Sequence, residues 1–183
     1  MIASVAALDM SVLQHLFAQR DTATTLAFIG ISELGSTLFV CGIALCVGLL
    51  LALRHKVPSA IGLAVSVLGG GATALLIKEL VHRARPEAIF QAYQETGFSF
   101  PSGHATLAAA AYGFFISLAW CMMPAGNKRS ILVAALTLLI ALIAFSRLYL
   151  GVHYLTDVVG GLLVGILFVY IGNFAAQKMR KRN

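Results

Sequence analysis

The residues of this sequence best suited to chemistry lie between two long apolar runs, in the stretch from Ser146 to Asp157. Ionisable groups beside segments of bilayer length are costly, so they indicate a functional site. His153 and Asp157 are four residues apart, so on a helix they would share one face within hydrogen-bonding distance. A carboxylate bound to one imidazole nitrogen fixes the tautomer and leaves the other nitrogen free to attack or to accept a proton.

Arg147, just before this pair, carries a planar guanidinium group suited to phosphate or carboxylate oxygens. Taken alone, these three residues also fit a structural role. His153 could cap a helix, Arg147 could reach the lipid headgroups, and Asp157 could pair with a neighbour. The rest of the chain favours the chemical interpretation.

A second polar block contains Lys78, Arg85 and Pro86. Lys78 and Arg85 are seven residues apart, so they would project from one face if the second apolar helix continued beyond the hydrocarbon. Pro86 restricts Arg85 away from helical backbone angles, and the helix is predicted to end there.

A third block, Pro101-Ser102-Gly103-His104, leads directly into the next apolar run. Backbone N–H groups at the start of a helix, together with the Ser102 hydroxyl, can form a cradle for an anion. His104 would enter the helix directed at whatever that cradle holds. A turn and a basic pair near the headgroups are the plainer interpretations of these two blocks.

The composition places the chain among membrane proteins. Its 183 residues are 60% hydrophobic and 11% charged, with a mean hydropathy of +0.91, which excludes an ordinary soluble domain. A net charge of +6 is better explained by basic residues in cytoplasmic loops than by a nucleic-acid partner. No cleavable signal pattern is visible at the start.

The apolar runs predict an all-α, polytopic bundle forming a single membrane domain over residues 1–183. About five transmembrane helices are long enough to cross a bilayer, and Gly161 and Gly165 would allow the last to pack closely. An amphipathic helix at residues 1–21 is expected to lie at the interface, before a catalytic bundle at 22–176 and a basic cytoplasmic tail at 177–183. The predicted spans cover residues 34–53, 58–77, 105–123, 131–145 and 154–175.

Charge at the ends of these spans predicts the topology. The basic clusters at 54–56 and 128–129 and the tail fall on one side, which the positive-inside rule makes cytoplasmic. The segments 78–104 and 146–153 then share the opposite face, and their basic residues run against that rule. An anion would explain them. An anion transporter is a weaker alternative, because its charges would be spread through several spans.

No metal or cofactor is expected. Cys41, Cys46 and Cys121 all lie in apolar runs without metal-ligand spacing or signs of a disulfide framework, so they are interpreted as small apolar packing residues.

In order, the three blocks read Lys-x6-Arg-Pro, Pro-Ser-Gly-His and Ser-Arg-x5-His-x3-Asp. This arrangement resembles the type 2 phosphatidic acid phosphatase superfamily over residues 26–175, including its haloperoxidase-like helical core. The superfamily also contains soluble acid phosphatases and vanadium haloperoxidases, and a haloperoxidase would gain nothing from five spans. The sequence matches the signature at every position: Lys78, Arg85, Pro86, Pro101, Ser102, Gly103, His104, Ser146, Arg147, His153 and Asp157.

The resemblance implies a role for each residue. His153 would form a phosphohistidine while Asp157 holds its ring, and His104 would protonate the leaving group and then activate water. The oxygens of the phosphoryl group would be held by Lys78, Arg85, Arg147, Ser102 and the Gly103 amide, without a metal ion.

The implied function is an integral-membrane lipid phosphatase, similar to small enzymes of the bacterial inner membrane, with its site on the extracytoplasmic face. The expected partners are membrane lipids and a lipid phosphate: undecaprenyl diphosphate, phosphatidylglycerophosphate or phosphatidic acid. The polar loop at 87–97 is where the choice of substrate is expected to lie. A lipid phosphotransferase is the alternative within the same superfamily, and the oligomeric state is left open.

Overall fold

The computed structural model describes residues 2–181, and every regular element within them is helical. The predicted all-α fold is therefore confirmed. The elements are α1 (Ile2–Ala18), α2 (Thr22–Glu33), α3 (Thr37–Leu53), α4 (Val57–Val81), the short 3-10 helix η1 (Ala88–Phe90), α5 (Gly103–Met122), α6 (Asn127–Tyr149) and α7 (Leu155–Arg180).

Four helices, α4 to α7, are long and apolar enough to cross a membrane. A fifth crossing is possible if α2 and α3, which meet at 42°, count as one broken span. The break falls at Gly35 and Ser36, where the Ser36 hydroxyl caps α3 by accepting from the Phe39 amide. The span predicted over 34–53 is thus a 17-residue helix preceded by a second helix that the sequence did not reveal.

The central helix is α5, which packs against α3, α4, α6 and α7 and is the most buried of the four long helices. Its run of alanines allows neighbouring backbones to approach closely. A Cβ atom added at Gly165 would lie 2.6 Å from the Thr106 carbonyl oxygen, and one at Gly161 would lie 2.5 Å from that of Ser102. The predicted close packing at these two glycines is confirmed, and it fixes the start of α7 against the start of α5.

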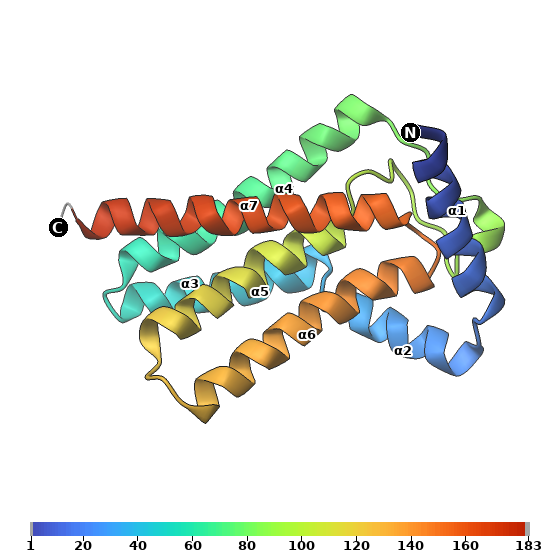
Figure 1. Cartoon of the computed structure of the whole chain (residues 1–183). Helices are drawn as coiled ribbons and strands as arrows, with labels where there is room; N and C mark the ends of the chain where they lie inside the picture. Colours follow the sequence, from blue (N-terminus) through green and yellow to red (C-terminus); the bar gives the residue numbers. More distant parts are fainter. Residues whose placement is uncertain (1, 182–183) are drawn as a thin grey trace.

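The bundle has two chemically different ends (Figure 1). The α3–α4 turn, the α5–α6 turn and the end of α7 lie together at one end, where Arg180 donates to the Ser59 hydroxyl at 2.8 Å. The opposite end holds α1, the segment between α4 and α5, and the α6–α7 connection. The three signature blocks are therefore collected at one end, away from the basic turns, as the charge pattern predicted.

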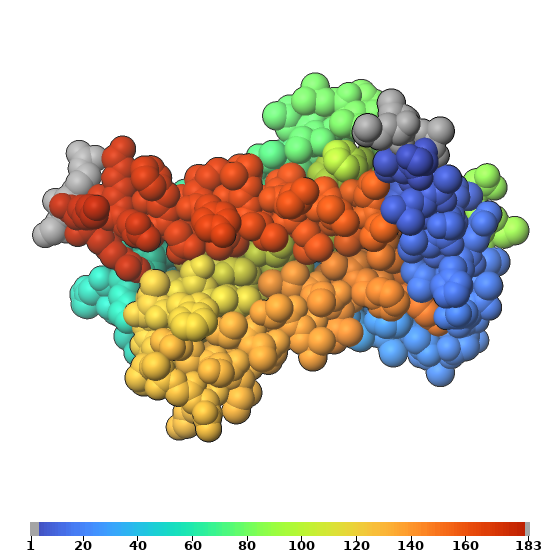
Figure 2. Space-filling model, viewed as in Figure 1, coloured from blue at the N-terminus to red at the C-terminus, as the bar shows by residue number. Residues whose placement is uncertain are grey.

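Helix α1 lies across the end of the bundle that holds the signature blocks (Figure 2) and contacts α6, α7 and η1. It exposes Val5, Leu8 and Phe17 but buries Leu13 and also Asp9, which is only 2% exposed. An N-terminal helix with an exposed apolar surface was predicted, whereas its buried carboxylate was not. Of the predicted basic tail, residues 182–183 lie outside the described part of the chain, and helix α7 includes 177–180.

Two local predictions are wrong. Helix α4 ends at Val81, four residues before Arg85, because His82 adopts a left-handed conformation and its amide closes the helix on the Lys78 carbonyl. Pro86 therefore does not end it. The three cysteines are free, but Cys46 and Cys121 are exposed on the helix surface rather than packed inside.

Candidate active site

The centre of the site is a carboxylate held by two arginines. Glu95, from the loop after η1, pairs with Arg85 at 2.6 Å through Nη1 and with Arg147 through Nη2. Its Oε2 atom lies 4.0 Å from Nε2 of His153. Burial raises the pKa of the Glu95 carboxyl, but Arg147 and Arg85 outweigh that effect and hold the pKa below its ordinary value. The two arginines therefore hold an anionic group between them, and in this structure it is the carboxylate of the chain's own loop.

Arg147 is fully buried in the last turn of α6. Its Nη1 donates to the Ser32 hydroxyl at 2.5 Å and to the Tyr93 hydroxyl at 2.6 Å. A buried guanidinium needs a counter-ion, and Glu95 supplies it. Ser32 and Tyr93 fix the plane of the guanidinium, so that Nη2 faces the anion. Neither residue was predicted from the sequence, because each comes from an element far from Arg147 along the chain.

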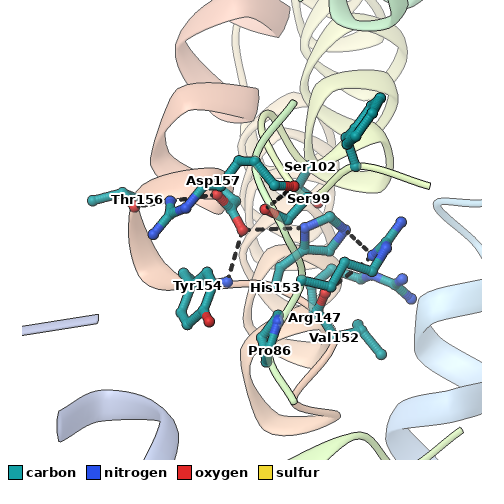
Figure 3. A network of polar contacts seen from close by, with 12 residues as sticks. Pro86, Ser99, Ser102, Arg147, Val152, His153, Tyr154, Thr156 and Asp157 are labelled. Atoms are coloured by element: carbon teal, nitrogen blue, oxygen red, sulfur yellow. Dashed lines mark hydrogen bonds and ion pairs between the residues drawn. The ribbon is translucent and has the colours of Figure 1, made fainter. Parts of the chain in front are cut away.

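His153 and Asp157 meet, although not for the reason predicted. His153 precedes α7, which begins at Leu155, so the two are not on one helical face. Instead, the Tyr154 amide donates to Asp157 Oδ2 at 2.9 Å, and this turn brings His153 Nδ1 to 3.5 Å from the same oxygen. Figure 3 shows this Asp157 oxygen facing both the His153 ring and the Tyr154 amide.

The neighbours of the His153 ring determine its tautomer. Nε2 lies 3.2 Å from Nη1 of Arg85, and a guanidinium nitrogen can only donate. Nε2 is therefore the acceptor, and the ring proton is on Nδ1, towards Asp157. Burial lowers the pKa of His153 to about 4, although the contact with Asp157 opposes this shift. The neutral ring thus keeps an unprotonated Nε2 beside the anion position, and an unprotonated imidazole nitrogen is suited to nucleophilic attack.

Lys78 and Arg85 reach the site by different routes. Lys78 lies in the last turn of α4 and donates to the Phe98 carbonyl at 2.5 Å. Arg85 lies in the extended chain after α4 and is oriented by the carbonyls of Gly97 and Val152, each at 3.0 Å. The predicted shared helical face is wrong, but both cations are close enough to Glu95 to interact electrostatically.

The Pro-Ser-Gly-His block forms the start of α5, with Ser102 as its N-cap residue and Gly103 and His104 in the first turn. The Ser102 hydroxyl is buried, makes no cap and has no hydrogen-bond partner within residues 2–181. The amides of the first turn have no intrahelical partner. Asp157 fixes this turn, because its carbonyl accepts from the Ser102 amide at 2.9 Å. The partly buried His104 is close enough to Arg147, Glu95 and His153 to interact electrostatically.

The remaining signature residues support the site from outside. Ser146 donates to the Ile143 carbonyl of its own helix at 2.7 Å, and Pro86 and Pro101 are fully buried. All the predicted site residues are therefore brought to one end of the bundle. Within residues 2–181, no three His, Cys, Asp or Glu side chains are grouped as ligands of a metal ion.

Five further polar residues of this region were not predicted from the sequence: Asp9, Ser32, Arg83, Tyr93 and Glu95. Arg83 lies between Lys78 and Arg85 in the sequence, but it pairs with both Asp9 and Asp157. The one signal for Asp9 was a carboxylate within an apolar helix. Glu95 lay in the loop expected to determine the substrate, but nothing in the sequence placed it between Arg85 and Arg147.

Together, the fold and the site define a class: a helix bundle of the membrane that holds an anion beside a histidine–aspartate pair. The chain belongs to the PAP2 superfamily, whose family model matches residues 59–181. It is 31% identical over 155 residues to phosphatidylglycerophosphatase B of Bacillus subtilis (strain 168), covering 83% of this chain and 75% of that protein. It is 33% identical over 86 residues to phosphatidylglycerophosphatase B of Escherichia coli (strain K12), covering 47% of this chain and 32% of that protein.

The fold also matches a solved structure. The crystal structure of the transmembrane PAP2-type phosphatidylglycerolphosphate phosphatase from Bacillus subtilis has a TM-score of 0.87, with 24% sequence identity. The match covers 96% of this chain and 87% of that one. It extends beyond the residues that the family model matches, so the N-terminal helices also belong to the shared fold.

Proposed function

We propose that the protein is an integral-membrane lipid phosphatase that hydrolyses a lipid phosphate or diphosphate through a phosphohistidine at His153. The observation that carries this proposal is the position of the Glu95 carboxylate. Two arginines hold it 4.0 Å from His153 Nε2, where a phosphoryl group would have to lie for in-line attack. Membership of the PAP2 superfamily and the similarity to a phosphatidylglycerophosphatase support the same activity.

The reaction proceeds in two displacements. The phosphoryl group replaces Glu95 between Arg85 and Arg147, and Nε2 of His153 attacks phosphorus as the bond to the leaving oxygen breaks. His104 gives its proton to that oxygen, and Asp157 stabilises the positive charge on the His153 ring. His104 then takes a proton from water, which attacks the phosphohistidine, releases phosphate and frees the nitrogen.

The cations neutralise the phosphoryl oxygens during both displacements. Arg85, Arg147 and Lys78 supply positive charge, while the Ser102 hydroxyl and the Gly103 amide supply directed donors. No metal ion is required for this charge neutralisation. We therefore expect chelators to leave the activity unchanged. We expect vanadate to inhibit it, because vanadate adopts the five-coordinate geometry of phosphoryl transfer.

An apolar groove supports a substrate with a lipid tail. It has a volume of about 280 Å³ and lies between α3, α4 and the start of α5, with Leu68, Leu75, Lys78 and Gly103 in its lining. A phosphate held in the site could thus keep its hydrocarbon among the lipid-facing helices. We place the site on the extracytoplasmic face of a bacterial inner membrane, because the basic turns lie at the opposite end of the bundle.

Phosphate release by the purified protein tests the proposal. The panel contains phosphatidylglycerophosphate, phosphatidic acid and undecaprenyl diphosphate, with His153→Ala as the inactive control. We expect release that EDTA does not reduce and vanadate abolishes. Transfer of the phosphoryl group to an added acceptor lipid would instead indicate a phosphotransferase. Loss of turnover in EDTA with recovery in Mg²⁺ would show that the cations do not suffice.

A further inference from the structure

Arg83 bridges two buried carboxylates at the edge of the site. Its Nη1 lies 2.6 Å from Oδ1 of Asp157, and its Nη2 lies 2.7 Å from Oδ2 of Asp9. The two aspartates are 0% and 2% exposed, respectively. The guanidinium also lies over the Tyr154 ring, 4.4 Å from its centroid. Arg83 is therefore held on three sides, by residues of α1, the α6–α7 connection and α7.

The bridge assigns different tasks to the two oxygens of Asp157. Oδ1 binds Arg83, while Oδ2 accepts from the Tyr154 amide and faces His153 Nδ1. A carboxylate fixed at both oxygens cannot rotate about its last bond. Without Arg83, only Oδ2 would be fixed, and the buried Oδ1 would lose its ionic partner. The orientation of Asp157 towards the histidine thus depends on Arg83.

Arg83 does not share the surroundings of the phosphate-binding cations. Arg85 and Arg147 both hold Glu95, whereas the ion pairs of Arg83 are with Asp9 and Asp157. Nη1 of Arg83 donates to Asp157 and to the Thr156 hydroxyl, and Nη2 donates to Asp9. Its part in the site is therefore to orient Asp157 rather than to bind an anionic substrate.

Asp9 is itself fixed by the start of α7. The Thr156 amide donates to Oδ1 at 3.0 Å, and the Thr156 hydroxyl donates to Oδ2 at 2.6 Å. Burial raises the pKa of Asp9, but the hydrogen bonds from Thr156 and Arg83 outweigh it and hold the pKa below its ordinary value. An ionised, clamped Asp9 gives Arg83 a fixed second anchor, so α1 is connected to the histidine through two ion pairs.

We propose that Arg83 and Asp9 are positioning residues, which orient Asp157 and through it His153, and that α1 thereby forms part of the catalytic apparatus. The inference rests on the proposed function, in which His153 is the nucleophile. Nothing in the phosphate-binding set has to change for the effect to appear. The chemical step should suffer when the bridge is removed, while the binding of phosphate should not.

Steady-state kinetics of the full chain in detergent tests this separation. We expect Arg83→Gln to lower kcat by about ten- to a hundredfold, as loss of a residue that orients a catalytic group does, without a matching change in KM or in vanadate inhibition. Asp9→Asn should lower kcat less, and the double variant should be no worse than Arg83→Gln alone, since both remove one bridge. Glu79→Gln, at an exposed carboxylate near the end of α4, is the matched control.

A readout independent of turnover completes the test. In protein labelled with ¹⁵N-histidine, His153 should show the tautomer with its proton on Nδ1, and Arg83→Gln should change that signal. Asp9→Asn keeps the size of the side chain and an accepting oxygen, so it carries the test should Arg83→Gln not fold.

Three results would overturn the inference. A raised KM with weaker vanadate inhibition would make Arg83 a phosphate ligand. An unchanged kcat with a lowered melting temperature would show that the bridge only stabilises the fold. An unchanged His153 signal would show that the ring is oriented without the bridge. If the wild-type protein hydrolyses no lipid phosphate, the proposed function fails, but the histidine spectrum still decides the positioning.

Discussion

At the scale of single residues, the site keeps its two histidines in different surroundings. His153 is buried in the α6–α7 connection, with Asp157 on one side of the ring and Arg85 on the other. His104 lies in the first turn of α5, only partly buried. In the proposed reaction the first histidine forms the covalent bond and the second moves protons, so substitutions should separate the two roles.

The first prediction separates the histidines by leaving group. We expect the His104→Ala substitution to lower the activity on a phosphate monoester by about 10²–10⁴-fold relative to the wild type, because the alkoxide leaving group needs protonation. The loss on an isoprenyl diphosphate should be smaller, because a phosphate leaving group has a lower pKa. His153→Ala should lose activity on both. Steady-state assays with phosphatidic acid and undecaprenyl diphosphate measure the difference.

The same variant should accumulate a phosphoenzyme if activation of water becomes limiting. Rapid quenching with labelled diphosphate would detect it as acid-labile, alkali-stable label. Equal losses on both substrate classes, with no trapped phosphohistidine, would mean that His104 only binds substrate and that the acid is another residue.

The second prediction concerns acid stability. The pKa of His153 is lowered to about 4 in the folded protein, against about 6.5 for an ordinary imidazole. Between these values the unfolded chain binds a proton that the folded site does not. The contribution of neutral His153 to stability is therefore complete above about pH 6.5 and falls as the pH drops towards 4, by up to about 3 kcal/mol.

Thermal unfolding in detergent between pH 7 and pH 4 measures this effect. The melting temperature of the wild type should fall more steeply than that of His153→Asn, which has no imidazole to protonate at this position. His55→Asn, at an exposed histidine of the α3–α4 turn, is the control and should follow the wild type. Parallel curves for His153→Asn and the wild type would show that His153 titrates normally in the folded protein.

At the scale of elements, the segment between α4 and α5 forms both a wall of the site and its occupant. It carries Arg85, which binds the anion, and also Glu95, which occupies the anion position. Tyr93 from the same loop contacts Arg147. In the proposed reaction, a substrate displaces Glu95 while Arg85 and Arg147 stay in place. This loop was expected to determine the substrate, and that stays a prediction; Glu95 is the carboxylate of the loop that pairs with both arginines.

The third prediction follows from that competition. Glu95→Gln removes the negative charge that competes with phosphate, so we expect vanadate to inhibit this variant at least about tenfold more strongly, equivalent to about 1.4 kcal/mol. The free variant should also melt at a lower temperature, because buried Arg147 loses its counter-ion, and vanadate should restore the lost stability. Glu87→Gln, at an exposed position of the same segment, is the control. Weaker inhibition of Glu95→Gln would show that Glu95 helps to bind the anion rather than competing with it.

At the scale of the whole molecule, the bundle is polarised along its length. The basic turns and the end of α7 lie at one end, and the anion site lies at the other under α1 (Figure 1). For a bundle of this kind, the positive-inside rule predicts an orientation with the basic end in the cytoplasm. The basic residues of the site do not follow this rule, because the negative charge of Glu95 or of a substrate neutralises their positive charge.

The fourth prediction tests this orientation. Single cysteines replace Glu87 and Lys128, both exposed and at opposite ends of the bundle, in a chain whose three natural cysteines are changed to alanine. An impermeant maleimide applied to intact cells should label Glu87→Cys but not Lys128→Cys, and permeabilised cells should label both. Labelling of Lys128→Cys alone in intact cells would place the site in the cytoplasm.

The sequence alone predicted the class of fold, the approximate positions of the spans and most residues of the candidate site. Bilayer-length apolar runs are a local property, and charge next to them is costly enough to mark function. The signature residues Lys78, Arg85, His104, Arg147 and His153 could be identified because their types and spacing are written along the chain. The positive-inside pattern then predicted that the three blocks lie at the same end of the bundle.

Only the tertiary structure decided how these residues meet. Lys78 and Arg85 share no helical face, because α4 ends at Val81, and His153 reaches Asp157 through the turn at Tyr154 rather than along a helix. The partners Ser32, Glu95 and Asp9 come from elements far away in the chain. Electrostatic pairing depends on distance in space, and the folded path of the chain sets that distance. The spacing of residues in a sequence cannot show which carboxylate will neutralise a buried arginine.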